Sequence, residues 1–527
     1  MSLADTRVCW PGGARRRGGV SLVCGSCTER EKASVDAASG VGGLQGREGS
    51  VPRQKPKALS TDAALAGGPA RSSWEAAACL GWRWSEGAGS PGMSNRSTGA
   101  ERLWEEARRD MPKPKDKPFA IPKSMVWEAW RQVKDNKGAP GVDGEDLEAF
   151  EADLEGNLYK IWNRMSSGSY FPPPVRAVPI PKKSGGQRIL GVPTVADRVA
   201  QMVVKQVVER TVEPVFMPDS YGYRPNKSAL DAIGVTRERC WKYDWVLEFD
   251  IRGLFDNIDH TLLLRAVRKH VKCEWALLYI ERWLTAPMEL EDGTRVGRTR
   301  GTPQGGVVSP VLANLFLHYA FDAWMTREHP DLPWCRYADD GLVHCRTEAE
   351  AVALKVALAA RLAECHLEMH PDKTKIVYCK DGRRRGSYPS TQFEFLGYCF
   401  RPRGAMNRKH KMFTGFGPQV SASSLKAMRQ KIRELRIRRR THIRLADIAR
   451  EINPILQGWL NYYGRYSPSA MHAVWKYVNA TLIAWAMRKY KRYNGRKIQA
   501  GQMIGSIANK RRKLFVHWHQ STVGAFA

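Results

Sequence analysis

The chain has 527 residues, enough for two or three domains, and it carries 84 lysines and arginines against 53 acidic residues. Its formal charge of +31 indicates a polyanionic partner, although charge alone says nothing about the fold. Eleven scattered cysteines favour a reducing compartment, and no apolar run approaches the length of a membrane span. The composition therefore argues against a disulfide-rich secreted protein and a helical membrane protein.

The first 92 residues differ in composition from the rest of the chain. They hold 16 of the 46 glycines, are rich in Ser, Ala and Arg, and show no sustained hydrophobic periodicity. Such a segment buries too little apolar surface to offset its ordering entropy, so residues 1–92 are predicted to be a disordered extension. They also lack the layout of a secretory signal. A clearer helical pattern begins only after Met93.

A basic hairpin is predicted next, within residues 178–193. Lys182, Lys183 and Arg188 flank a Ser-Gly-Gly turn between two β-type runs. Such a hairpin would lie across a polyanion, and Arg suits bidentate contact with phosphate. The structural alternative is a solvated basic turn.

A strand is predicted over residues 245–251, where Trp245, Leu247 and Phe249 alternate toward one face. Asp250 ends this run, and a segment rich in Gly, Asn and Asp follows it. That segment marks a turn before the next helical pattern. Asp250 is therefore a candidate ligand at a strand end, with a helix-capping acid as the alternative.

The most informative stretch is Tyr-Ala-Asp-Asp-Gly at residues 337–341, which is typical of the tip of a short β-hairpin. Asp339 and Asp340 repel one another unless a cation lies between them, and oxygen ligands of this kind suit Mg²⁺. Two-metal phosphoryl-transfer sites take carboxylates from separate strands, so Asp250 would meet this pair across a sheet. Taken alone, the motif is equally compatible with a solvated acidic turn.

The excess positive charge is concentrated at the C-terminal end. Residues 401–527 contain 27 lysines and arginines and three acidic residues. Apolar residues there recur at helical spacing and predict three amphipathic helices. Cations that are consecutive or interleaved with tyrosines suit unpaired RNA bases and phosphates, although a solvated face is the alternative. These candidate RNA-binding residues are Arg438, Arg439, Arg440, Arg488, Lys489, Lys491 and Arg492.

Six blocks in the same order resemble the reverse transcriptases encoded within bacterial group II introns, usually described as reverse transcriptase/maturases. The blocks span roughly 260 residues, and their order is far more specific than a lone Asp-Asp pair. They are residues 137–144, 178–193, 249–251, 301–306, 337–340 and 395–398. The resemblance implies an α+β right-hand polymerase, with fingers and a palm built on an antiparallel sheet, followed by a helical thumb and maturase region.

The same resemblance implies two Mg²⁺ ions held by Asp250, Asp339 and Asp340, with the carbonyl of Ile251 as a further ligand. It assigns nucleotide contacts to Lys182, Arg188, Phe255, Gln304 and Lys373. In this assignment Phe255 is the aromatic gate that excludes a ribose 2′-hydroxyl, and Lys375 is the alternative to Lys373. The implied primer grip is Phe395, Leu396, Gly397 and Tyr398.

The domains implied by these patterns divide the chain into five. They are residues 1–92, the disordered extension; 93–160, an N-terminal helical segment and the start of the fingers; 161–400, the fingers and palm; 401–500, the thumb and maturase-specific region; and 501–527, a basic tail. By the resemblance, residues 1–92 would be intron sequence upstream of the true start.

The implied function is an RNA-directed DNA polymerase that copies intron RNA from a primer 3′-hydroxyl and also binds that RNA to assist splicing and mobility. Its expected partners are a group II intron RNA, a DNA target or primer and dNTPs, in a bacterial cytoplasmic ribonucleoprotein, with the oligomeric state left open. After Trp518 no Cys pairs or His cluster suggest an endonuclease, so priming from an existing DNA end is expected. The alternatives are a splicing-only RNA-binding maturase and a retron or diversity-generating reverse transcriptase.

Overall fold

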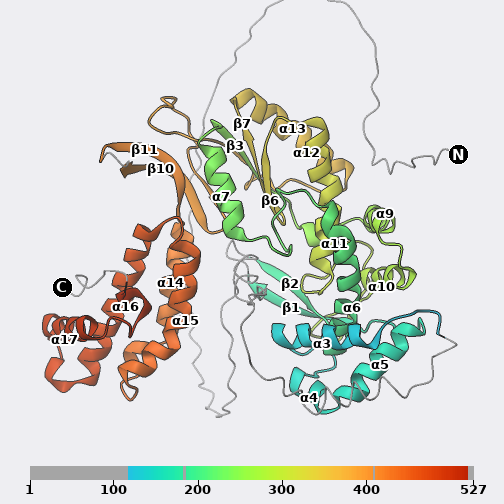
Figure 1. The fold of residues 1–527 in the computed structure, drawn as a ribbon, viewed down its shortest axis with the longest axis horizontal. Coiled ribbons are helices and arrows are strands. Elements are labelled where there is room, and N and C mark those ends of the chain that lie inside the picture. Colours follow the sequence, from blue (N-terminus) through green and yellow to red (C-terminus); the bar gives the residue numbers. More distant parts are fainter. Residues whose placement is uncertain (1–116, 182–185, 407–409, 520–527) are drawn as a thin grey trace, which may run out of the picture. The chain divides into compact units, whose positions relative to one another are not determined.

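The computed structural model describes residues 117–181, 186–406 and 410–519 (Figure 1). These residues form an α+β structure of three small sheets and numerous helices, which confirms the predicted fold class. The predicted disordered extension and Lys182 lie outside the described residues. Within those residues, no helix is long and apolar enough to cross a membrane.

Helices form most of the described N-terminal part of the chain. Asp146 and Thr194 each accept a hydrogen bond from a backbone N–H at the start of a helix, so both act as N-caps. The helices are α3 (Lys123–Asn136), α4 (Leu147–Ala152), α5 (Leu154–Ser166), α6 (Val195–Val212) and the 3₁₀ helix η1 (Glu213–Val215).

The first sheet contains the predicted basic hairpin. Its strands are β1 (Val175–Pro181), β2 (Gln187–Val192), β4 (Met288–Glu289) and β5 (Arg295–Val296), in the order β2-β1-β4-β5. β1 and β2 are antiparallel, with Ile180 opposite Arg188. Arg188 is therefore the second residue of β2, near the start of that strand.

The central sheet is antiparallel throughout and has the order β6-β7-β3-β8. Its strands are β3 (Trp245–Asp250), β6 (Trp334–Tyr337), β7 (Asp340–Cys345) and β8 (Lys375–Tyr378). Both β3 and the β6–β7 hairpin match the sequence prediction. Asp250 is paired in register with Asp340, so the two acidic segments meet at one end of the sheet.

Helices pack against this sheet and make both its faces interior (Figure 1). Ala232 and Ile233 of α7 join Val246, Leu342 and Val377 in the core. The helices of this part are α7 (Ala229–Cys240), α8 (Leu254–Asn257), α9 (His260–His270), α10 (Glu274–Thr285), α11 (Ser309–Leu317), the π-helix η2 (His318–Asp322), α12 (Ala323–Glu328) and α13 (Glu348–Glu364).

A third sheet leads into the C-terminal helices. Its strands are β9 (Phe393–Phe395), β10 (Tyr398–Met406) and β11 (Met412–Val420), in the order β11-β10-β9. The helices that follow are α14 (Ala422–Glu434), η3 (Ile437–Arg439), α15 (Leu445–Tyr463), α16 (Pro468–Lys489), η4 (Lys491–Tyr493), α17 (Lys497–Lys510) and η5 (Val516–Trp518).

The C-terminal helices share an aromatic core. Trp475, Trp485 and Trp518 are fully buried, and Phe515 lies with them in the same cluster. Three amphipathic helices were predicted here, and the structure adds a fourth long one, α17. Its buried face consists mainly of small residues, which give a weak periodic signal. The expected boundary at residue 501 falls inside α17.

Candidate active site

The Asp-Asp motif occupies a strained turn between β6 and β7. Ala338 has a left-handed backbone with φ 56°, an unfavourable region for a residue with a Cβ. Gly341 is required by packing, because a Cβ there would lie 2.2 Å from the ring of Phe249 on β3. The turn is therefore pressed closely onto the strand that carries Asp250.

Three carboxylates converge where β3 meets this turn. Burial raises the pKa of Asp339, and the charge of Asp250 raises it further. Burial and the charges of Asp339 and Asp250 hold the pKa of Asp340 well above its usual value. Each shift reports that concentrated negative charge is costly in this position unless a cation compensates it.

Lys373 supplies one positive charge to this cluster. Its Nζ donates a hydrogen bond to Oδ2 of Asp250 at 2.9 Å. Burial acts to lower the pKa of Lys373, but the hydrogen bond and charge of Asp250 outweigh it and raise the pKa. Lys375 instead lies on β8 opposite Glu248. Of the two candidate lysines, Lys373 is the one that contacts the carboxylate cluster.

The donor set fits Mg²⁺ in its chemistry. Asp250, Asp339 and Asp340 offer only oxygen atoms, and Mg²⁺ is bound in proteins through one or two carboxylates completed by water and phosphate. Among residues 117–181, 186–406 and 410–519, no three or more His, Cys, Asp or Glu side chains lie together as a set of metal ligands. Mg²⁺ bound by these carboxylates would complete its coordination with water or substrate oxygens.

A buried arginine holds the acidic turn from behind. The Arg336 guanidinium donates to both carboxylate oxygens of Asp322, at 2.7 and 2.6 Å, and both side chains are fully buried. It also donates to the carbonyl of Ala338 at 3.2 Å, to Oδ1 of Asn314 at 3.1 Å and to Oγ of Ser220 at 2.8 Å. These five bonds use all five guanidinium N–H groups. Arg336 thus ties the strained residue of the turn to the molecule's interior.

The position of Asp322 depends on an unusual helix. The π-helix η2, which ends at Asp322, interrupts an otherwise α-helical run. π-Helical turns are rare and occur frequently at functional sites. In this structure the π-helical turn places the Asp322 carboxylate against Arg336. The helix distortion therefore helps to set the geometry of the acidic turn.

A backbone segment from residues 219–223 closes over the same turn. A Cβ on Gly222 would lie 2.4 Å from the backbone nitrogen of Ala338, so only glycine fits there. Burial, and then the charge of Asp339, raise the pKa of Tyr223. The Tyr223 ring meets the edge of Phe255 at a centroid distance of 6.5 Å. Phe255, the predicted gate, is thus held next to the acidic turn by an aromatic neighbour.

The loop that carries Gln304 lies on the short helix α8. Backbone nitrogens of Gly301 and Thr302 donate to the carbonyls of Ile258 and Phe255, both at 2.7 Å. A Cβ on Gly301 would lie 2.7 Å from the same Phe255 carbonyl. The loop and the predicted gate are therefore fixed to one another.

Gln304 connects the basic hairpin to α8. Its Nε2 donates to both oxygens of Asp256 at 3.0 Å, and its Oε1 accepts a hydrogen bond from Nε of Arg188. Three of the predicted nucleotide-contacting positions, Arg188, Phe255 and Gln304, thus lie in one connected arrangement.

A second buried network supports this loop. Asp197 accepts hydrogen bonds from Tyr170, Gln201 and Trp283 at 2.7–2.9 Å. Burial raises the pKa of Asp197 to about 6, although these hydrogen bonds oppose the shift. Oε1 of Gln201 in turn accepts the backbone N–H of Val307 at 2.7 Å.

Helix α11 begins at Ser309, directly after this loop. Ser309 precedes a proline and looks like an N-cap, but its hydroxyl bonds to Oγ1 of Thr302 at 2.7 Å and caps nothing. The Thr302–Ser309 bond closes the loop on itself.

The predicted primer grip is a tight turn with buried side chains. Leu396 and Gly397 both have positive φ, 49° and 77°, between β9 and β10. Phe395, Leu396 and Tyr398 are each at most 3% exposed, and the Tyr398 hydroxyl donates to the carbonyl of Tyr462. A primer contact from this turn would therefore come from its backbone, and its role stays a prediction.

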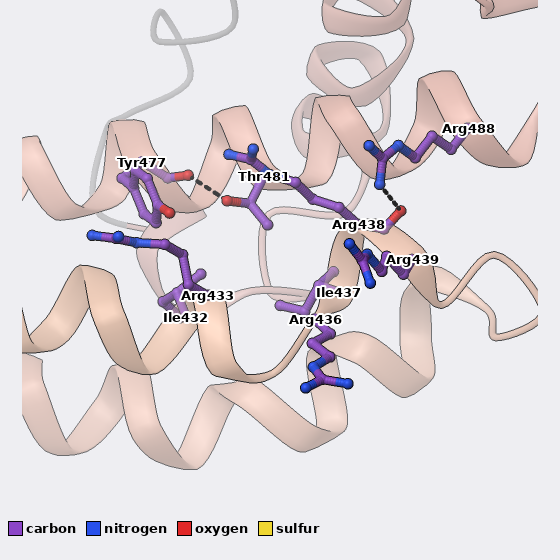
Figure 2. Close-up of a pocket in the computed structure, with 9 residues that line it drawn as sticks. All are labelled: Ile432, Arg433, Arg436, Ile437, Arg438, Arg439, Tyr477, Thr481 and Arg488. Carbon is purple, nitrogen blue, oxygen red and sulfur yellow. Dashed lines mark hydrogen bonds between the residues drawn. The ribbon is translucent and has the colours of Figure 1, made fainter. Parts of the chain in front are cut away.

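The predicted RNA-binding cations divide into two kinds. Arg438, Arg439 and Arg488 are exposed and line a cavity between α14, η3 and α16 (Figure 2). Arg440 instead pairs with Glu451 at 2.7 Å, and Lys489 donates to two backbone carbonyls. Lys491 and Arg492 are exposed on η4. The structure therefore gives Arg440 and Lys489 internal partners that the sequence does not reveal.

Several supporting residues were missed from sequence. Arg336, Asp322, Tyr223, Asp197 and Gln201 carry no motif of their own. One signal was available for Arg336, which is a charged residue inside an apolar strand directly before the acidic turn. Charged residues are almost never fully buried unless they are paired, so such a residue predicts a buried partner.

Comparisons with known proteins agree with this geometry. Residues 180–400 match the family "Reverse transcriptase (RNA-dependent DNA polymerase)", and residues 425–502 match "Group II intron, maturase-specific domain". The carboxylate-bearing sheet lies in the first match and the arginine-lined cavity in the second. The chain is therefore a reverse transcriptase in class, with the fingers and palm of a right-hand polymerase followed by a helical maturase region.

Comparison with individual relatives identifies the family within this class of reverse transcriptases. Protein YkfC of Escherichia coli K12 is 32% identical over 315 residues, which cover 51% of this chain and 78% of YkfC. The group II intron-encoded protein LtrA of Lactococcus lactis is 34% identical over 203 residues, 38% of this chain but only a third of LtrA. The chain belongs to the group II intron reverse transcriptase/maturase family. A solved telomerase from Candida albicans aligns with 72% of this chain and 68% of its own, at 12% identity and a TM-score of 0.38.

Proposed function

We propose that this protein synthesises DNA on an RNA template by extending a primer 3′-hydroxyl, with two Mg²⁺ ions. The observation that supports this most directly is the register of the central sheet, which pairs Asp250 with Asp340 and brings Asp339 beside them. When bound there, Mg²⁺ would activate the attacking hydroxyl and stabilise the leaving oxygen. The Ile251 carbonyl is a further candidate ligand.

The chain's own residues would position the substrates. Lys373, which lies against Asp250, is suited to hold the leaving pyrophosphate by charge. Arg188 and Gln304 would orient the triphosphate and the templating pair, and Phe255 would exclude a ribose 2′-hydroxyl. In phosphoryl transfer most of the rate comes from such positioning and charge neutralisation. Lys182, which lies outside the described residues, is proposed to act with Arg188.

The C-terminal helices are proposed to bind the intron's own RNA and so to assist splicing and mobility. Support comes from the match of residues 425–502 to a maturase-specific domain and from the exposed arginines there. We propose that residue 400 is the boundary between the palm and this region. A DNA target or primer and dNTPs complete the set of proposed partners.

The second candidate is a maturase that binds RNA without polymerising. The three carboxylates and Lys373 favour polymerisation, because a protein that only binds RNA gains nothing from clustered acids, which repel a phosphate backbone. The maturase-specific match disfavours a retron-type enzyme.

Primer extension on an RNA template with dNTPs and Mg²⁺ tests the proposal. Asp339→Ala is expected to abolish synthesis and to leave RNA binding unchanged, since the cluster would lose a metal ligand while the C-terminal helices stay intact. Asp331→Ala is the matched control and should retain synthesis, because Asp331 is an exposed carboxylate that precedes β6, whereas Asp339 follows that strand. Undiminished synthesis by the Asp339 variant would refute the proposed mechanism.

A further inference from the structure

A cavity of about 450 Å³ opens between α14, η3 and α16 (Figure 2). Five arginines line it: Arg433, Arg436, Arg438, Arg439 and Arg488. None of the residues that line it is acidic, and among the described residues none of these five pairs with a carboxylate. Five cations around one concavity repel each other, so the cavity is electrostatically complementary to an anion.

The arginine-bearing segment is fixed in place before any ligand arrives. Arg488 donates to the carbonyl of Arg438 at 3.4 Å, and Nε1 of Trp485 donates to that of Arg440 at 3.0 Å. Lys489 donates to the carbonyls of Thr441 and Ile443, at 2.7 and 2.8 Å. Arg436 is held in a left-handed conformation with φ 48°. A preformed cavity of this kind loses little entropy when it binds.

The remaining lining of the cavity is uncharged. Ile432, Ile437 and Thr481 are buried, and Tyr477 is half-buried with its ring in the wall (Figure 2). A volume of about 450 Å³ falls in the usual range for organic ligands and far exceeds the need of one phosphate. A ligand that uses the whole lining would combine an anionic part with a flat part that stacks on the Tyr477 ring. A nucleotide has both.

We propose that this cavity binds a single unpaired nucleotide extruded from an RNA strand. Its phosphates would lie on the arginines and its base against Tyr477, because unstacked RNA bases are recognised on aromatic rings and guanidinium planes. RNA is favoured because the whole cavity lies within the maturase-specific match, residues 425–502. The proposal rests on the proposed RNA-binding function and adds that this part of the protein reads an irregularity in the RNA.

The test compares two RNA hairpins that differ by one unpaired nucleotide, using the full-length protein. Thr481→Tyr fills the cavity without changing its charge. This variant is expected to bind the bulged hairpin about tenfold more weakly and the fully paired hairpin unchanged. Tyr477→Leu should weaken bulged-hairpin binding similarly, by removing the stacking surface. A thermal melt of each variant shows whether the fold is intact.

Charge-matched variants separate the cavity from general electrostatics. Arg438→Gln should reduce the preference for the bulged hairpin, whereas Arg450→Gln, at a residue 81% exposed, should weaken both hairpins equally. If Thr481→Tyr and Tyr477→Leu leave the preference intact, the proposal is overturned. It also fails if a DNA bulge or a free nucleoside monophosphate binds as tightly as the RNA bulge. A wild-type protein that binds neither hairpin would instead contradict the underlying RNA-binding function.

Discussion

The acidic turn and the arginine-lined cavity use charge in opposite ways. Behind the turn, Arg336 and Asp322 are fully buried and every guanidinium N–H has an acceptor. Around the cavity, Arg433, Arg438 and Arg439 are exposed to solvent. In the first region charge fixes a geometry, and in the second it remains available to a ligand.

This difference predicts how each region responds to substitution. A buried ion pair that loses one member leaves an uncompensated charge in the interior, which is strongly destabilising. An exposed arginine that is removed leaves nothing unsatisfied, and its contribution to binding is small, additive and screened by salt. Substitutions at the acidic turn should thus have large, cooperative effects, and those at the cavity small, graded ones.

The largest effect is expected at Arg336. Arg336→Leu should destabilise the fold by about 3–5 kcal/mol, because Asp322 would remain buried without a partner. Chemical denaturation at pH 7 measures this change. The variant should also lose nearly all primer extension, since the carbonyl of Ala338 would no longer be held.

A double variant separates the effect of Arg336 on the stability of the fold from its effect on the position of the acidic turn. Arg336→Met with Asp322→Leu removes both charges, and such apolar replacements are often neutral for stability. Stability is expected to recover while kcat stays low and the KM for dNTP changes little, because the turn still lacks its support. Arg361→Lys is the control, because Arg361 is also buried but donates hydrogen bonds to the carbonyls of Tyr319 and Ala320 rather than to the acidic turn. This variant should keep its kcat. Full recovery of kcat in the double variant would limit Arg336 to a role in folding.

The C-terminal region also contains a buried imidazole, that of His517, which sharpens the contrast. His517 is fully buried, and its Nε2 lies 2.7 Å from Oδ1 of Asn479, which also accepts Nε1 of Trp518. Burial lowers the pKa of His517 to about 3. The unfolded chain therefore binds a proton more readily, so stability is lost as pH falls below about 6.5 toward 3.

Acid unfolding measures this contribution. Between pH 7 and pH 4, His517 should account for about 2–3 kcal/mol of lost stability. His517→Gln keeps a polar side chain that does not titrate, so its stability should fall less over the same range. Equal pH dependence in the two proteins would show that His517 is accessible to protons in the folded state.

A smaller effect is expected at Phe255, whose role is shape rather than charge. Phe255→Val should lower the preference for dNTPs over rNTPs by about 10- to 100-fold, because a smaller side chain leaves room for the 2′-hydroxyl. The ratio of kcat/KM values for dCTP and CTP measures it. Tyr223→Phe keeps the ring that contacts Phe255 and should leave the ratio unchanged. An unaltered preference in the Phe255 variant would assign selection to another residue.

Sequence patterns predicted the acidic turn itself better than they predicted the buried residues that support it. The strand ending at Asp250 and the hairpin at Asp339 follow from alternation and turn chemistry, which are local. Arg336 meets Asp322 only because a π-helix places that carboxylate, and no sequence period specifies it. Asp197 and Gln201 were missed for the same reason, since their partners lie on other elements.

In the C-terminal region, composition predicted the overall charge but not the partners of individual residues. Composition alone showed that it is strongly basic, but could not distinguish cations with internal partners from free ones. Arg440 lies in a run of three arginines, yet only the fold brings Glu451 to it. The cavity likewise combines η3 with Tyr477 and Thr481, which come from a helix some 40 residues later.

The smallest effects are expected at the exposed arginines, where the distinction between fixed and available charge can be tested most directly. Arg439→Gln should weaken binding of a paired RNA hairpin only a few-fold and reduce the slope of log K against log salt by about 0.7–0.9, one phosphate contact. Arg440→Gln should lower the slope less, because Arg440 already pairs with Glu451 at 2.7 Å. If both variants change the slope equally, the ion pair opens when RNA binds, and the distinction between fixed and available charge does not hold in this region. If Arg439→Gln instead destabilises the fold by several kcal/mol, the exposed arginines are structural, as Arg336 is.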